Sequence, residues 1–201
     1  MYLRFFKRGI DLFLSILILI LLFPFILAIF LLLLIQNNGK VFYFQERLGK
    51  FEKKFRVIKF KTMNDARDEM GRFLGDSKRV TKIGGFIRYF SFDEIPQLFN
   101  VLKGEMSLVG PRPFIAEYQN LYKDWQRERH NVRPGMTGWA QINGRNCLTW
   151  NEKFHLDVWY TRNVSFLLDV KIFLFTFIKI FQSKDVNSSK FVTMDKFNGE
   201  N

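Results

Sequence analysis

The most apolar part of the chain is the run from Leu12 to Ile35, in which only Ser15 and Pro24 are not strongly apolar. A straight helix of this length is about 36 Å long, compared with about 30 Å for the hydrocarbon core of a membrane. The run is therefore long enough to cross a membrane. It is too long for the apolar part of a cleaved signal peptide, and no small-x-small cleavage site follows it.

Two features favour a segment that enters and leaves the membrane on the same side. Pro24 divides the run into two halves, each about half a bilayer deep. Basic residues flank both ends, so the positive-inside rule gives no preferred direction. They are Arg4, Lys7 and Arg8 before the run, and Lys40, Arg47, Lys50, Lys53 and Lys54 after it. On the residues alone, a spanning helix and a re-entrant segment are equally compatible with this pattern.

Shorter apolar patterns follow. Val41–Phe44 is a strand candidate, and the stretch from Phe55 to Met63 alternates apolar and basic positions with the period of a strand. This alternation places Lys59 on the face opposite Ile58, where a lysine is usually simply solvated. From Lys82 to Phe92, apolar residues recur with helical spacing, which predicts an amphipathic helix suited to a lipid surface or to a protein core.

In the second half of the chain, the pattern of apolar positions predicts three helices and one strand. The helices are Phe114–Arg129, Trp150–Asn163 and Phe166–Phe181, and the strand is Trp139–Ile142. The last helix is apolar on most sides but too short to span a membrane comfortably, so we expect it to lie at the interface. It contains Asp169, an ionisable group in an apolar setting that needs a partner such as a nearby arginine or lysine.

Composition narrows the class of partner. The chain has 31 Lys and Arg against 19 Asp and Glu, a net charge of +12 that suits nucleic acid, anionic lipid or phosphorylated substrates. Its 25 Phe lie mainly in apolar runs and do not alternate with arginines, which favours a membrane surface over nucleic acid. A lone Cys147 excludes an internal disulfide, and His130 and His155 have no metal-ligand spacing.

The stretch from Arg88 to Pro113 carries the strongest candidate chemistry. Pro96 belongs in a first helical turn, so a helix is expected to begin at or just before Asp93 and Glu94. The positive end of such a helix favours anions, phosphate included. The alternative is structural, because Ser91 to Glu94 also matches a capping box with Ser91 as the N-cap.

Three turns are plausible contacts for a diphosphate. They are Gly110-Pro111-Arg112-Pro113, Arg133-Pro134-Gly135-Met136-Thr137-Gly138 and Gly144-Arg145-Asn146. Glycine lets the backbone approach a ligand closely, and arginine offers a planar fork to phosphate. Each could equally be a purely structural turn.

Four motifs, in this order, resemble the bacterial sugar transferase family. The motifs are KFKTM (59–63), SFDEIPQLFNVLKGEMSLVGPRP (91–113), RPGMTGWAQINGRN (133–146) and SFLLDVKI (165–172). The family comprises the monotopic phosphoglycosyl transferases, and this chain has the length of their minimal catalytic core. Within the family it is most similar to the small undecaprenyl phosphate N,N'-diacetylbacillosamine 1-phosphate transferase.

The resemblance implies transfer of a sugar 1-phosphate from a UDP-sugar to undecaprenyl phosphate, with release of UMP and a requirement for Mg²⁺. The sugar would be N,N'-diacetylbacillosamine or a related N-acetylated sugar. Asp93 would be the nucleophile that forms a covalent phosphosugar intermediate, and Glu94 its partner. The remaining implied roles are phosphate binding by Lys59, Arg88, Arg112 and Arg145, metal binding by Asp93 and Glu94, and support by Pro111 and by Asp169, which would orient an arginine.

The resemblance also implies the fold, an α/β (mainly α) membrane-associated protein. A re-entrant helix broken at Pro24 would occupy residues 1–40, and a catalytic domain with interfacial helices and a small β element residues 41–182. A polar, loosely held tail would follow over residues 183–201. One departure is Phe23 before Pro24, where the family often has a serine whose hydroxyl satisfies a freed backbone group.

The expected location is the bacterial inner membrane, with the catalytic domain in the cytoplasm. The expected partners are the two substrates, membrane phospholipids and downstream glycosyltransferases of glycoconjugate assembly, and no nucleic acid. The alternative is a membrane-tethered basic module that binds anionic lipid or nucleic acid without catalysis. Such a module would tolerate loss of the Asp93 charge, since removing negative charge strengthens anion binding.

Overall fold

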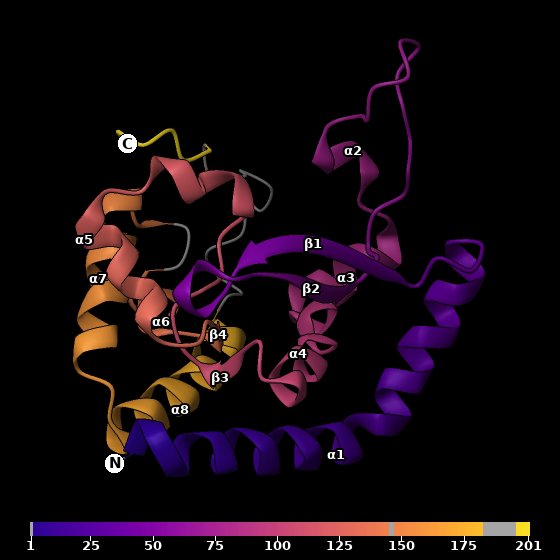
Figure 1. The fold of residues 1–201 in the computed structure, drawn as a ribbon. Coiled ribbons are helices and arrows are strands. Elements are labelled where there is room, and N and C mark those ends of the chain that lie inside the picture. Colours follow the sequence, from indigo (N-terminus) through magenta and orange to yellow (C-terminus); the bar gives the residue numbers. More distant parts are fainter. Residues whose placement is uncertain (1, 145–146, 183–195) are drawn as a thin grey trace.

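The computed structural model describes residues 2–144, 147–182 and 196–201 (Figure 1). The described helices are α1 (Lys7–Gln36), α2 (Asp76–Arg79), α3 (Lys82–Tyr89), α4 (Gln97–Lys103), α5 (Asp124–Arg127), α6 (Trp139–Asn143), α7 (Trp150–Arg162) and α8 (Phe166–Gln182). The strands are β1 (Phe42–Leu48), β2 (Lys54–Phe60), β3 (Ser107–Val109) and β4 (Gly135–Thr137). The predicted mainly helical chain with a small β element is confirmed.

Two small sheets organise the chain between the helices. β1 and β2 form an antiparallel hairpin in which Phe42 lies opposite Phe60, so both predicted strands are confirmed. β3 and β4 pair in parallel and join segments far apart in the sequence. The strand predicted over Trp139–Ile142 is wrong, because these residues form α6. The apolar run is too short to distinguish the helical period from the strand period. Ala140 and Ile142 are both buried although they belong to a helix.

α1 runs along one side of the domain and bends near its middle (Figure 1). The bend accompanies Pro24 inside the helix, as expected where a proline removes a backbone hydrogen bond. Among the described residues, α1 is the helix long and apolar enough to cross a membrane by length and composition. Most of its large apolar side chains are exposed, which is consistent with a membrane-associated segment.

Both ends of α1 are held by the same domain. Near its start, Arg8 Nη2 donates to the carbonyl of Leu102 at 2.9 Å, and Asp11 accepts a 2.7 Å hydrogen bond from the Ser107 hydroxyl. Beyond its end, the side-chain amide of Asn37 donates to the carbonyl of Lys61 at 2.8 Å. The two halves therefore return the chain to one globular unit.

The predicted helix over Phe114–Arg129 is wrong. The segment consists of a 3₁₀ turn (Ala116–Leu121), the short α5 and a second 3₁₀ turn (Glu128–Asn131). Tertiary packing overrides the helical spacing here, because Tyr118 and Tyr122 are both drawn into an aromatic cluster.

The helices on either side of this segment follow the sequence more closely. α7 and α8 confirm the two predicted helices, and α7 begins with a capping box between Thr149 and Glu152. α3 confirms the amphipathic helix, but its apolar face is divided. Ile87 is buried, whereas Phe86 is exposed.

The end of the chain returns to the aromatic cluster. Phe197 is buried among Phe114, Trp150 and Phe154, and its N–H donates to the Tyr118 hydroxyl at 3.2 Å. The prediction of a loosely held tail is therefore wrong for residues 196–201, because one aromatic side chain among polar neighbours is enough to anchor them. For residues 183–195 the prediction lies outside the described part of the chain.

Candidate active site

The two adjacent carboxylates lie in a tight turn before α4. Phe92–Glu94 forms a 3₁₀ turn, and α4 begins at Gln97 with Pro96 as its N-cap residue. The predicted helix start at or just before Asp93 is therefore wrong, because the two carboxylates lie in the 3₁₀ turn and not in α4. The capping interpretation is wrong, because Ser91 has a left-handed backbone (φ 59°) and its side chain caps nothing. A left-handed non-glycine residue is costly, and such strain tends to occur at functional sites.

Glu94 contacts two cations instead of reaching back to the helix start. Its Oε1 accepts 2.6 Å contacts from Lys59 Nζ, which projects from β2, and from Arg112 Nη2. Arg112 Nη1 also donates to Oε2 at 3.3 Å, which makes a two-pronged contact. Burial alone would raise the pKa of Glu94, but Arg112 and Lys59 hold it far below its usual range.

Asp93 has a different environment although it is the neighbouring residue. Its nearest cation is Lys59, with Nζ 3.8 Å from Oδ2, and within the described chain its carboxylate makes no hydrogen bond. Burial and the negative charge of Glu94 raise the pKa of Asp93, against the opposing charges of Lys59, Arg88 and Arg112. The two carboxylates therefore have separated acidities, which is typical of active sites.

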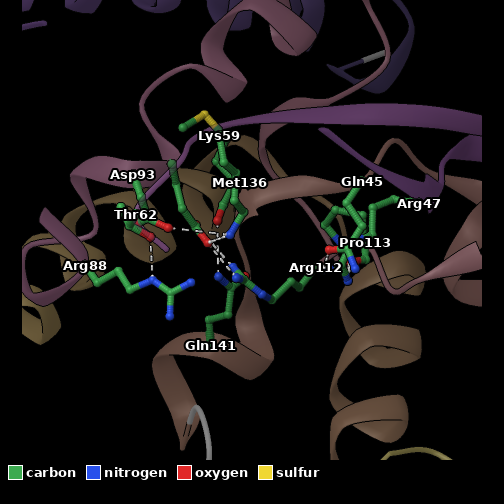
Figure 2. A network of polar contacts seen from close by, with 11 residues as sticks. Gln45, Arg47, Lys59, Thr62, Arg88, Asp93, Arg112, Pro113, Met136 and Gln141 are labelled. Atoms are coloured by element: carbon green, nitrogen blue, oxygen red, sulfur yellow. Dashed lines mark hydrogen bonds and ion pairs between the residues drawn. The ribbon is translucent and has the colours of Figure 1, made fainter. Parts of the chain in front are cut away.

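The predicted phosphate-binding residues converge on this pair from separate elements. Arg88 extends from α3 and donates from Nε to the Thr62 hydroxyl at 2.7 Å, and Figure 2 shows it near Asp93, with Arg112 on the other side. Lys59, Arg88 and Arg112 are thus brought together as predicted. Arg145 lies outside the described residues.

The turn that carries Arg112 is fixed by close backbone packing. The Gly110 N–H donates to the Thr137 carbonyl, and the Gly135 N–H donates to the Pro111 carbonyl, each at 2.9 Å. A Cβ atom on Gly135 would lie 2.1 Å from the Gly110 nitrogen, so only glycine permits this approach. The glycines predicted for ligand contact therefore serve to bring two turns together.

A buried ion pair that the sequence analysis did not identify supports the same turn. Arg129 donates from Nη2 to the Arg112 carbonyl at 2.6 Å and to Asp157 Oδ2 at 2.7 Å. Its guanidinium also lies 4.0 Å from the centre of the Phe114 ring. Both charged side chains are almost fully buried. Asp157 lies among buried positions of α7, and that helical pattern was the signal available in the sequence.

Asp169 is bound by the start of the chain and by α7, and not by the described residues of the carboxylate site. It accepts hydrogen bonds from Lys7, from Tyr160 at 2.6 Å and from Tyr2 at 2.6 Å. The expectation of a cationic partner is confirmed by Lys7, but the expectation that Asp169 orients an arginine is wrong. The group fastens the start of α1 to α7 and α8, because three residues distant in sequence share one carboxylate.

A cavity of about 820 Å³ is lined by Glu94 and Arg112 of the carboxylate site. Apolar side chains of α1 (Ile18, Leu22) and α8 (Phe173, Phe177) also line it. Its remaining lining includes the basic residues Arg47 and Lys153 and the aromatic residues Tyr118 and Trp150. Such a cavity can hold a ligand with both apolar and anionic parts.

The carboxylate pair is also compatible with a magnesium ion. Mg²⁺ is usually held by one or two carboxylates together with substrate phosphates and water. Asp93 has carboxylate oxygens without hydrogen-bond donors in the described chain, whereas Glu94 would have to share its oxygens with Lys59 and Arg112. No cluster of three or more His, Cys, Asp or Glu side chains suited to a metal occurs within the described residues. Asp93 is thus the better ligand.

Comparison with known proteins places the chain in a family. The model of the bacterial sugar transferase family matches residues 2–183. The chain is 50% identical over 165 residues to the uncharacterized sugar transferase EpsL of Bacillus subtilis strain 168, covering 82% of each protein. It is 38% identical to the UDP-N-acetylgalactosamine-undecaprenyl-phosphate N-acetylgalactosaminephosphotransferase of Aeromonas hydrophila (84% of this chain, 42% of that protein).

It is also 37% identical to the UDP-glucose:undecaprenyl-phosphate glucose-1-phosphate transferase of Escherichia coli K12, covering 90% of this chain. The chain spans 41% of that protein, so it matches less than half the length of these two named transferases. The matched segment contains every described residue of the carboxylate site. The chain belongs to the bacterial sugar transferase family.

Proposed function

We propose that the chain transfers a sugar 1-phosphate from a UDP-sugar to undecaprenyl phosphate and releases UMP. The observation that carries this proposal is a cavity lined by Glu94 and Arg112 and by apolar side chains of α1 and α8, with Asp93 adjacent to Glu94 in the chain. A soluble, anionic donor and a lipid-linked phosphate acceptor can both reach such a site. The activities for which the two transferases compared above are named support the same reaction class.

Asp93 is the proposed nucleophile. An Asp93 oxygen attacks the phosphorus that bears the sugar, the bond from that phosphorus to the bridging oxygen breaks, and UMP leaves with the bond electrons. An oxygen of undecaprenyl phosphate then attacks the same phosphorus, and the Asp93 carboxylate is released. Covalent catalysis thereby divides one difficult displacement into two easier ones.

The contacts explain why Asp93 and not Glu94 takes this role. Glu94 uses both oxygens to hold Lys59 and Arg112, whereas the Asp93 oxygens have no hydrogen-bond donor in the described chain. Glu94 therefore orients two cations toward the phosphates of the donor. When bound, Mg²⁺ would be held by Asp93 and would supply charge neutralisation at the diphosphate.

The attachment of both ends of α1 to one domain supports a re-entrant membrane segment. A spanning helix would carry its two ends to opposite sides of the bilayer, which contacts from Arg8 and Asn37 to the same domain would not allow. In this arrangement the domain faces the cytoplasm at the bacterial inner membrane. The hydroxyl absent at Phe23 is not replaced by Ser15. Ser15 is too distant along the chain from Pro24, and its buried hydroxyl makes no hydrogen bond among the described residues.

The donor sugar is the finer part of the proposal. N,N'-diacetylbacillosamine or a related N-acetylated sugar stays the predicted donor. The two relatives are named for UDP-N-acetylgalactosamine and for UDP-glucose, so donors with and without acetamido groups belong in the same assay.

The test is UMP release from a panel of UDP-sugars with undecaprenyl phosphate and Mg²⁺, in detergent. Wild type is expected to release UMP repeatedly, beyond one equivalent per protein, only when undecaprenyl phosphate is present, and Asp93→Asn is expected to abolish the release. Asp76→Asn, which removes an exposed carboxylate from α2, is the matched control and should retain activity. If folded wild type releases UMP from no donor, the chain is a membrane-tethered binding module.

A further inference from the structure

We propose that Arg47 and Lys153, at the end of the cavity away from α1, bind the phosphate that stays with the nucleoside of the donor. This subsite would hold the UMP half of the UDP-sugar before and after the bond breaks. The inference rests on the proposed function, because it divides the donor between two ends of one cavity.

Arg47 brings a positive charge to this end without an acidic partner in the described chain. Its guanidinium donates to the Pro113 carbonyl at 3.1 Å and to the Gln45 side-chain oxygen at 2.5 Å, and both acceptors are neutral. Burial, followed by the charge of Arg112, lowers the pKa of Arg47 to about 10. An uncompensated, partly desolvated arginine is a strong site for a phosphate.

Lys153 adds a second cation from a different element. It projects from the second turn of α7 and lines the same cavity as Arg47, with its ammonium 5.4 Å from the centre of the Trp150 ring. Burial, together with the nearby charge of Arg112, lowers the pKa of Lys153. Three cations thus converge where Tyr118 and Trp150 form aromatic walls.

The position of this end favours the nucleoside phosphate over the lipid phosphate. Tyr160, near the end of α7, bonds to the Asp169 group that fastens the start of α1. Lys153 lies seven residues earlier, which is about 10 Å along the helix axis. Figure 1 shows α7 running away from α1 in this direction. An acceptor held in the membrane enters at the α1 and α8 end.

The geometry of phosphoryl transfer also places the nucleoside phosphate at the end of the cavity that contains Arg47 and Lys153. In phosphoryl transfer the attacking and leaving oxygens lie roughly in line across the phosphorus. Figure 2 shows Asp93 on one side of Arg112 and Arg47 on the other. A donor whose reacting phosphorus lies near Arg112 and Asp93 therefore directs its leaving phosphate toward Arg47 and Lys153.

The experiment measures UMP binding to the purified full chain in detergent by calorimetry, together with steady-state kinetics. Lys153→Gln and Arg47→Gln are each expected to weaken UMP binding about tenfold and to raise the KM for the UDP-sugar similarly, with an unchanged KM for undecaprenyl phosphate. Lys54→Gln, which removes an exposed lysine paired with Glu46 on the same hairpin, is the matched control. Arg47→Lys keeps the charge and should retain most of the binding if Arg47→Gln folds poorly.

Two results would overturn the assignment. Unchanged UMP binding in both glutamine variants would remove the subsite while leaving lipid-dependent turnover, and hence the proposed function, intact. A raised KM for undecaprenyl phosphate with unchanged UMP binding would assign this end to the lipid phosphate. Failure of the proposed function would instead be seen as no turnover by wild type.

Discussion

Removing the charge of Asp157 should both destabilise the protein and impair the site. Asp157→Asn would leave the Arg129 guanidinium buried without a counter-charge, since both side chains are almost inaccessible to water. Breaking a buried ion pair by removing one partner typically costs about 3–5 kcal/mol. For a chain of this size, a loss near the lower value lowers Tm by roughly 10 °C.

A double substitution separates stability from positioning. Replacing the pair by apolar residues, Arg129→Met with Asp157→Leu, removes both charges and should restore most of the lost stability. The Arg112 carbonyl would still lack its 2.6 Å donor, so the turn that holds Arg112 would be less well fixed. A lost charge-assisted hydrogen bond is worth about 1.5–3 kcal/mol, which predicts a kcat/KM roughly tenfold to a hundredfold below wild type.

Thermal denaturation in detergent and lipid-dependent UMP release measure these two effects. The control is Glu128→Gln, which breaks the exposed pair between Glu128 and Arg162 and should leave Tm and kcat/KM close to those of wild type. A double variant with wild-type kcat/KM would refute the positioning role of Arg129. An Asp157→Asn variant as stable as wild type would refute the cost assigned to the buried charge.

Three further predictions concern the carboxylates, the paired turns and the membrane segment. Asp93 must be ionised to attack, so kcat/KM should fall as the pH drops through the raised pKa of Asp93. Glu94→Gln removes a neighbouring negative charge and thereby lowers the pKa of Asp93. The acid limb of the pH profile should therefore move to lower pH in this variant. An acid limb that does not move would contradict this coupling. Gly135→Ala places a Cβ against backbone and should abolish UMP release or soluble expression, and a fully active variant would disprove the close approach. In a cysteine-free background, Ile10→Cys and Asn38→Cys should both react with a membrane-impermeant thiol reagent from the cytoplasmic side only, whereas labelling from opposite sides would establish a spanning helix.

The elements with a long, regular pattern could be predicted from sequence. The runs that became α7 and α8 are long enough for several helical turns, and the alternation before Met63 was sufficient to predict β2. Prediction from a short apolar run failed, because the few residues of α6 fit the period of a helix and that of a strand equally well. The segment after Phe114 failed for a different reason, since its aromatic side chains are placed by contacts with α7 and with Phe197.

The candidate site was predictable where a motif carried it and unpredictable where only packing did. Asp93, Glu94, Lys59, Arg88 and Arg112 lie in the motifs and converge in the structure. The sequence could not distinguish a cap from an ion pair at Glu94, because that depends on β2 and the Arg112 turn lying beside it. The partners of buried charges are equally non-local, so Asp169 was assigned an arginine and is bound by Lys7.

A covalent intermediate on Asp93 can be detected by intact-protein mass spectrometry after the protein is mixed with a cognate UDP-sugar and Mg²⁺, without lipid acceptor. We predict one equivalent of released UMP and a mass increase equal to one sugar phosphate. Both should be absent in Asp93→Asn, and the adduct should disappear when undecaprenyl phosphate is added. Lipid-dependent turnover by a chain that never gains this mass, or an adduct that persists in Asp93→Asn, would contradict the account.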